Sequence, residues 1–137
     1  MNVRPATSPA ELPGMSTEQL RDRFVAGGLF VSGEVTTLYT HEDRMVIGGA
    51  VPVPGTPLTL ETADPLRSSF FCERRELGIV AVAGPGVVEV DGERFPMGHQ
   101  DVLYVGMGAR TIVFHADVGE ETAFYLVSSL AHVTHPT

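Results

Sequence analysis

The stretch FFCERRELGIVAVAGPG, residues 70–86, decides how the rest of the chain is interpreted. A block of four charged residues, 73–76, comes directly before an apolar run that ends in the Gly-Pro-Gly turn 84–86. A short apolar run bounded by glycine and proline is typical of a buried β-strand. The stretch therefore predicts a strand over 77–83 that starts from a charged block and ends in a glycine turn.

Short runs of the same kind recur on both sides of this strand. They are rich in Val, Ile, Leu, Thr and Tyr and are separated by Gly, Pro and Asp, which is typical of antiparallel strands in a sandwich or barrel. The clearest hairpin has Asp91-Gly92 at its tip, where a type I′ turn needs two positive φ angles. The predicted strands are 29–33, 35–40, 45–51, 58–61, 68–72, 77–83, 87–90, 93–95, 102–105, 111–116 and 122–129. No run after residue 28 has helical periodicity, so we expect an all-β body.

The first 28 residues differ from the rest. Residues 1–14 are proline-rich and without pattern, which indicates a loose arm or a segment that packs on a partner. The sequence Ser-Thr-Glu-Gln from Ser16 forms a capping box and predicts a short helix over 16–26. Leu20 and Phe24 lie four residues apart on one face of it and can dock on a larger body. We therefore divide the chain into an arm with a helix, 1–28, and a single barrel, 29–137.

Composition excludes several classes of function. A chain of 137 residues with 43% hydrophobic and 19% charged residues is one globular domain. A net charge of −8 argues against nucleic-acid binding, and the absence of lysine excludes Schiff-base chemistry. One cysteine makes no internal disulfide, and the sequence has neither a secretory signal nor an apolar run that spans a bilayer. We expect a cytoplasmic protein without nucleic-acid or membrane partners.

The frame around 70–86 is similar to the metal-bearing segment of cupin-type barrels, and the fold we expect is a cupin-type jelly-roll barrel. In that pattern His-x-His precedes a glutamate, a further histidine follows on a later strand, and all four point inward. Counting from the glycine turns, the equivalent inward positions are Phe70, Cys72, Leu77 and Thr111. Phenylalanine and leucine do not ligate metals, and threonine is a poor ligand beside imidazole. We expect no metal in this barrel and an interior filled by packing.

A different site remains open in the same region. His115 follows Thr111 by four residues on the same strand and face, where it can meet Cys72 inside the barrel. A Cys-His pair binds zinc or creates a reactive thiolate. The alternative is a small buried cysteine and a histidine near the strand end. The other four histidines lie in turns or in the tail, where surface roles are the ordinary explanation.

The block 73–76 is the most polar cluster of the chain. In a functional interpretation Arg74 or Arg75 binds a substrate carboxylate through two parallel hydrogen bonds, and a glutamate serves as the proton-transfer base. In the alternative, the four charges form a self-neutralising strand edge or a subunit contact. Spacing alone does not decide between the two.

Four segments together resemble the N-terminal half of one enzyme family. They are HEDRMVIGGAVPV (41–53), FFCERRELGIVAVAGPGVVEVDG (70–92), GHQDVLYVGMGA (98–109) and AHVTHPT (131–137). The family is that of the 5-keto-4-deoxyuronate isomerases, or 4-deoxy-L-threo-5-hexosulose-uronate ketol-isomerases. The resemblance runs from the opening MNVR to the last residue, with interruptions in the loops around 8–15 and 54–66.

The resemblance implies a two-cupin protein that breaks down pectin-derived uronates in the bacterial cytoplasm. It implies isomerisation of 5-dehydro-4-deoxy-D-glucuronate to 3-deoxy-D-glycero-2,5-hexodiulosonate, with zinc held by a His-x-His-x4-Glu arrangement in the second cupin. That arrangement brackets the same Glu-Arg-Arg run, so its ligands correspond here to Phe70, Cys72 and Leu77, and the zinc ligands lie outside this chain. The resemblance also implies homo-oligomers such as hexamers.

On this basis we expect the chain to be mainly structural and inactive alone, with its C-terminal cupin half and a uronate as partners. One alternative is a stand-alone, non-catalytic cupin module for sugar-acid binding or assembly. Another is a self-contained metal enzyme that uses Cys72 and His115.

Overall fold

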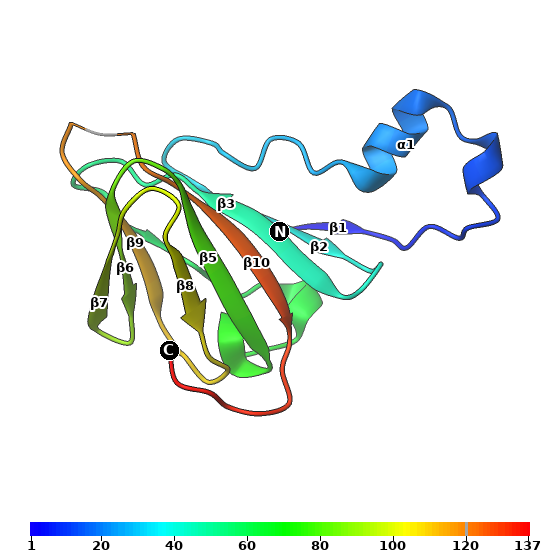
Figure 1. Ribbon diagram of the computed structural model, residues 1–137. Coiled ribbons are helices and arrows are strands. Elements are labelled where there is room, and N and C mark those ends of the chain that lie inside the picture. The colour runs from blue at the N-terminus through cyan, green and yellow to red at the C-terminus, as the bar shows by residue number, and fades with distance from the viewer. Residues whose placement is uncertain (120) are drawn as a thin grey trace.

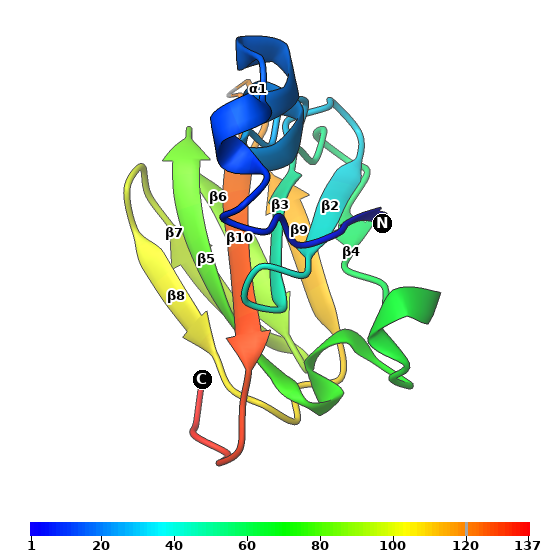
Figure 2. The same ribbon diagram turned by 90° about the vertical axis from the view of Figure 1, so that its right-hand side faces the viewer.

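The computed structural model describes residues 1–119 and 121–137, which form two facing β-sheets (Figures 1 and 2). The six-stranded sheet has the order β1 (Asn2–Arg4), β2 (Val35–Thr40), β3 (Met45–Ala50), β10 (Ala123–Leu130), β5 (Arg75–Ala83) and β8 (Val102–Val105). The four-stranded sheet has the order β4 (Leu58–Thr59), β9 (Ile112–Ala116), β6 (Gly86–Val90) and β7 (Glu93–Met97). The predicted all-β barrel with one N-terminal helix is confirmed.

The last strand holds the larger sheet together. β10 lies between β3 and β5 and pairs antiparallel with both, so that Leu126 is opposite Gly48 on one side and Ile79 on the other. The only parallel pair among the described strands is β1 with β2, where Asn2 is opposite Leu38. This return of the last strand to the middle of the sheet brings the charged block at the start of β5 next to the end of β10.

Side chains alternate between the inner and outer faces of the strands, and the inward-facing ones form the core between the sheets. On β5 the odd-numbered residues from Arg75 to Ala81 face inward and are buried, whereas their even-numbered neighbours face outward. Phe114 of β9 and Phe124 of β10 meet across the interior with ring centroids 5.4 Å apart. The buried cluster includes Val46, Leu60, Phe71, Cys72, Leu77, Ile79, Val88, Met97, Val105, Ile112, Phe114, Phe124 and Leu126. Apolar side chains fill most of the interior, as the sequence predicts.

The predicted hairpin is confirmed in detail. Asp91 and Gly92 have φ angles of 50° and 88°, and Val90 is opposite Glu93 at the ends of β6 and β7. The Asp91 carboxylate accepts hydrogen bonds from the backbone N–H groups of Arg110 and Thr111, at 2.9 and 2.8 Å. One residue therefore closes this turn and fixes the loop that leads into β9.

The N-terminal region contains the predicted helix and one unpredicted strand. Helix α1 (Thr17–Phe24) begins with both hydrogen bonds of the capping box of Ser16. It ends at Phe24, two residues earlier than predicted, because Val25 is already extended. Residues 2–4 of the predicted loose arm form β1 in the sheet. Arg4 then donates to the carbonyls of Arg23 and Val25, which links β1 to the end of α1.

Helix α1 stands away from the barrel in Figure 1 and lies in front of the upper end of the barrel in Figure 2. It buries none of its residues, and Phe24 remains half exposed. None of the helices in the two described ranges is long and apolar enough to cross a membrane. The division at residues 28 and 29 stays a prediction.

Two predicted strands are wrong. Residues 68–72 instead lead into the 3₁₀ helix η3 (Phe71–Glu73), following η2 (Asp64–Leu66). The Glu73 carboxylate accepts the Ser69 N–H and closes this segment into a turn. Phe71 and Cys72 within this segment are both buried.

Residues 29–33 form no strand because they cross over β3. A Cβ atom on Gly49 would lie within van der Waals overlap of the Leu29 carbonyl oxygen, so the crossing needs glycine there. Gly33, with a φ of 77°, turns the chain and donates to the Val51 carbonyl. A third short helix, η1 (Leu12–Gly14), lies in the arm.

Candidate functional site

Arg75 is a charged residue inside the barrel. It is the first residue of β5 and faces inward like Leu77, with only 4% of its surface exposed. Its Nε donates to the Ser128 hydroxyl at 3.0 Å, and its Nη2 donates to the carbonyls of Ser128 and Arg44 at 2.9 and 2.7 Å. The guanidinium also lies over the Tyr39 ring, 5.8 Å from its centroid. All of these partners are uncharged.

The Arg75 charge therefore has no counter-ion in the parts of the chain that the structure describes. The ion pair of Arg94 with Glu89 and the contact of His115 with the same carboxylate both lie on the other sheet. Burial lowers the pKa of the Arg75 guanidinium, and the nearby Tyr39 and Cys72 side chains partly oppose that shift. A buried cation held only by neutral acceptors favours an anion as its next neighbour.

The other charged side chains of the block 73–76 also form no ion pair with one another among the described residues. Arg74 is exposed and donates to the Arg67 carbonyl at 2.8 Å. Glu76 faces outward and accepts hydrogen bonds from the hydroxyls of Tyr104 and Ser129, at 2.9 and 3.1 Å. The bond to Glu76 raises the pKa of Tyr104. The alternative of a self-neutralising strand edge is therefore wrong for the described contacts.

Both arginines line one small cavity at the end of the barrel. Its volume is about 90 Å³, and its walls are Tyr39, Pro65, Leu66, Ser68, Arg74, Arg75 and Leu130. A larger cleft of about 400 Å³ shares Ser68 and Arg74 with it and is otherwise lined by Thr62, Ala63, Asp64, Arg67, Ser69 and Glu73. The η2–η3 segment, which the sequence predicts as a strand in part, forms much of both walls. The sequence indicates the two arginines but not this segment.

The residues at the predicted metal positions do not fit a zinc ion. Cys72 and Leu77 are fully buried, as predicted. Phe70 is only half-buried, with the Arg110 guanidinium 5.0 Å from its ring centroid, and Thr111 is exposed and bonded to Asp91. The inward placement predicted for these last two is wrong, because Phe70 comes directly before the 3₁₀ helix η3 and Thr111 comes directly before β9. Within residues 1–119 and 121–137, no three His, Cys, Asp or Glu side chains gather as a metal site.

The Cys72–His115 site that the sequence left open does not form, and the alternative of a small buried cysteine and a histidine near the strand end is the one observed. Phe114 fills the core, so its neighbour His115 points to the opposite, outer face of β9. Burial raises the pKa of the Cys72 thiol to about 12, which keeps it protonated at neutral pH. Neither residue offers the other a partner.

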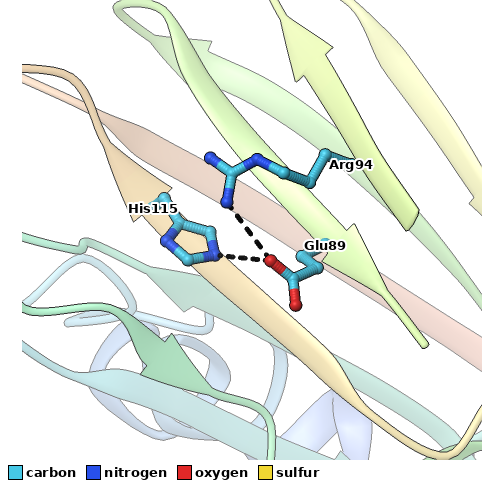
Figure 3. Close-up of polar contacts among 3 residues, drawn as sticks. All are labelled: Glu89, Arg94 and His115. Carbon is cyan, nitrogen blue, oxygen red and sulfur yellow. Dashed lines mark hydrogen bonds and ion pairs between the residues drawn. The ribbon is translucent and has the colours of Figure 1, made fainter. Parts of the chain in front are cut away.

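His115 instead joins a polar cluster that sequence reasoning missed. Its Nε2 lies 3.4 Å from the Glu89 carboxylate, which also contacts Arg94 at 3.2 Å (Figure 3). The Asp91-Gly92 turn is the sequence signal from which the pair of Glu89 and Arg94 could have been predicted, because the register of this hairpin places these two residues opposite each other. The pairing of β6 with β9, which adds His115, is long-range and has no local signal.

Several curated proteins that are similar to this chain carry the same enzyme name. No family model matches the chain. A 4-deoxy-L-threo-5-hexosulose-uronate ketol-isomerase of Bacillus pumilus is 49% identical over 137 residues, covering 100% of this chain and 50% of the relative. Proteins of the same name from Kineococcus radiotolerans and Bacillus subtilis are 48% and 41% identical, with the same coverage.

The chain belongs to the 4-deoxy-L-threo-5-hexosulose-uronate ketol-isomerase family. It spans about half the length of these curated ketol-isomerases, so it corresponds to one half of such a protein. The predicted resemblance is confirmed at that level. The zinc that the resemblance implies elsewhere in the ketol-isomerases stays a prediction.

Solved structures confirm the cupin fold of this chain. A cupin domain of a transcriptional regulator from Enterobacter cloacae matches with a TM-score of 0.56 and 11% identity, over 72% of this chain and 97% of that domain. A cupin protein from Bacteroides fragilis matches with a TM-score of 0.53 and 12% identity, over 82% and 89% of the two chains. At these identities the likeness establishes the cupin fold alone.

Proposed function

We propose that this chain is the N-terminal half of a uronate ketol-isomerase and is mainly a structural partner of a catalytic half. The reaction is the interconversion of 5-dehydro-4-deoxy-D-glucuronate and 3-deoxy-D-glycero-2,5-hexodiulosonate, in the cytoplasmic breakdown of pectin-derived uronates. The observation that carries the proposal is identity of 41–49% to one half of the curated relatives, over the whole of this chain.

The filled interior supports the structural role. Moving a carbonyl between neighbouring carbons needs a base that transfers a proton and a group that polarises the oxygen. Here Leu77, Phe114 and their neighbours occupy the interior, and Cys72 stays protonated. We assign the reacting groups, including the zinc ligands of the family, to the half that this chain does not contain.

The outer face of the six-stranded sheet supports a docking role. Val82, Val102 and Tyr104 are exposed there on adjacent strands, Val102 with 70% of its surface. Val80 and Tyr125 extend this apolar face toward the middle of the sheet. Apolar side chains gathered on one face mark an interaction surface. We assign this face to the second cupin barrel, and association of such two-barrel units would give the expected homo-oligomer.

Reconstitution tests the proposal. The chain would be assayed for uronate isomerisation alone and after mixing with the separately produced other half of the Bacillus pumilus relative. We expect no turnover by either part alone and turnover by the mixture. Val102→Asp should abolish this complementation, whereas Val118→Asp, at a residue 90% exposed in a loop, should not.

Two results would refute the structural role. One is isomerisation by this chain alone, and the other is full activity of the other half in its absence. A chain that binds a sugar acid but never associates with the other half would instead support the stand-alone module.

A further inference from the structure

The geometry points to a carboxylate-binding subsite in the cavity beside Arg75, with a hexuronate as its ligand. The choice of a uronate rests on the proposed function, whereas the preference for a carboxylate rests on the cavity alone. The inference depends on three features of the described residues: an unneutralised buried cation, a second arginine in the wall of the same cavity, and a polar cleft that continues the cavity.

The first feature is the hydrogen bonding of Arg75. Its Nε and Nη2 donate to oxygen atoms of Ser128 and Arg44, which fixes the guanidinium in place. Its Nη1 donates to none of the described residues, although the side chain is 96% buried and lines the cavity. Five N–H groups make up a guanidinium, so those of Nη1 are free to bind a ligand. The cation is therefore held rigidly with unused donors.

The second feature is the charge of the cavity wall. Arg74 and Arg75 both line it, and none of its seven lining residues is acidic. Two positive charges at one cavity contrast with the net charge of −8 of the whole protein. Arginine binds carboxylates through paired hydrogen bonds that are stronger than those between neutral groups. A carboxylate in this cavity would supply the counter-ion that Arg75 lacks.

The third feature is the shape of the combined site. The cavity of about 90 Å³ accepts a carboxylate group but is too small for a sugar ring. The adjoining cleft of about 400 Å³ is lined by hydroxyl and carboxylate groups from Thr62, Asp64, Ser69 and Glu73. These groups are suited to sugar hydroxyls. A ligand with a carboxylate at one end and hydroxyls at the other matches both parts, and Arg74 lies between them.

Binding of D-galacturonate to the whole chain tests the inference, with D-galactose as the neutral counterpart of the same ring. Calorimetry and NMR titration should show saturable binding of galacturonate and none of galactose. Arg74→Ala should weaken galacturonate binding by about tenfold or more, as expected for loss of a hydrogen bond between charged groups. Leu130→Trp, which fills the mouth of the cavity without removing charge, should abolish it. Arg94→Ala, the same charge change on the other sheet, should leave it unaltered.

Arg75→Lys is a useful variant only if it folds, so Arg74→Ala and Leu130→Trp carry the test. Absence of galacturonate binding by the unmodified chain would overturn the inference, as would equal binding of galactose or equal loss in Arg94→Ala. A concentration-dependent dimer that Arg74→Ala dissociates, with no response to galacturonate, would assign the cavity to a carboxylate of a second copy and also overturn it. Galacturonate binding without complementation of the other half would refute the proposed function and leave the subsite standing.

Discussion

Replacing Ser128 with alanine should lower the free energy of unfolding by about 2 kcal/mol. The Ser128 hydroxyl accepts from Arg75 Nε at 3.0 Å and donates to the Glu76 carbonyl at 2.7 Å, and the residue is 1% exposed. Alanine leaves the charged Nε–H without an acceptor at a site that water reaches poorly. Loss of a hydrogen bond to a charged group costs about 1.5–3 kcal/mol. The two bonds of Nη2 to carbonyls remain, so the loss should not exceed this range.

Urea unfolding followed by circular dichroism measures the change, with an unaltered slope expected. For a domain of this size the melting temperature should fall by about 6–10 °C. Ser129→Ala is the matched control, because its hydroxyl bonds the Glu76 carboxylate on the outer face at 3.1 Å. Water can replace that bond, so we expect a loss below about 1 kcal/mol. If Ser128→Ala costs no more than Ser129→Ala, Arg75 is not anchored inside the barrel and the subsite loses its basis.

Two further results follow from Cys72 and Asp91. Burial raises the pKa of the Cys72 thiol from 9.0 to about 12. The unfolded chain therefore releases this proton first, and stability present below about pH 9 is lost as the pH rises, by up to about 1.4 kcal/mol per unit. Urea titrations from pH 8 upward should show this slope reduced in Cys72→Ala, and identical slopes would contradict it. Asp91→Ala should cost about 2–3 kcal/mol, because the carboxylate accepts the N–H groups of Arg110 and Thr111. Asp91→Asn keeps an acceptor and tolerates the φ of 50°, so it should cost clearly less; equal losses in thermal unfolding would count against this assignment.

Local signals account for the parts of the fold that were predicted correctly. The capping box of Ser16 and the Asp91-Gly92 turn depend on neighbouring residues only, and both form as predicted. Regular alternation likewise identified the strands that pack on the core. The two wrong strands, 29–33 and 68–72, are apolar runs whose backbone is directed by distant or irregular contacts, such as the crossing over Gly49.

The candidate site was predicted in composition but not in geometry. The charged block indicated Arg74 and Arg75 as candidate binding residues; both line the cavity, and their role in binding stays a prediction. Its four side chains separate, however, because β5 begins within the block, at Arg75, and sends that side chain inward. The Ser128 contact depends on β10 returning beside β5 from 53 residues away, which no local pattern reveals. The placement of the His115 side chain inside the barrel was wrong for a similar reason. It was counted from Thr111, and Thr111 does not face inward, so the count assigned His115 to the wrong face of β9.

The three residues of β1 have a consequence for handling the protein. They pair with the outer side of β2, whose backbone N–H and C=O groups would otherwise be open to strands of other molecules. β1 itself is short and is followed by Pro5, which limits further recruitment. Proteolytic trimming of the first five residues would uncover the β2 margin, and we expect the trimmed protein to aggregate on storage.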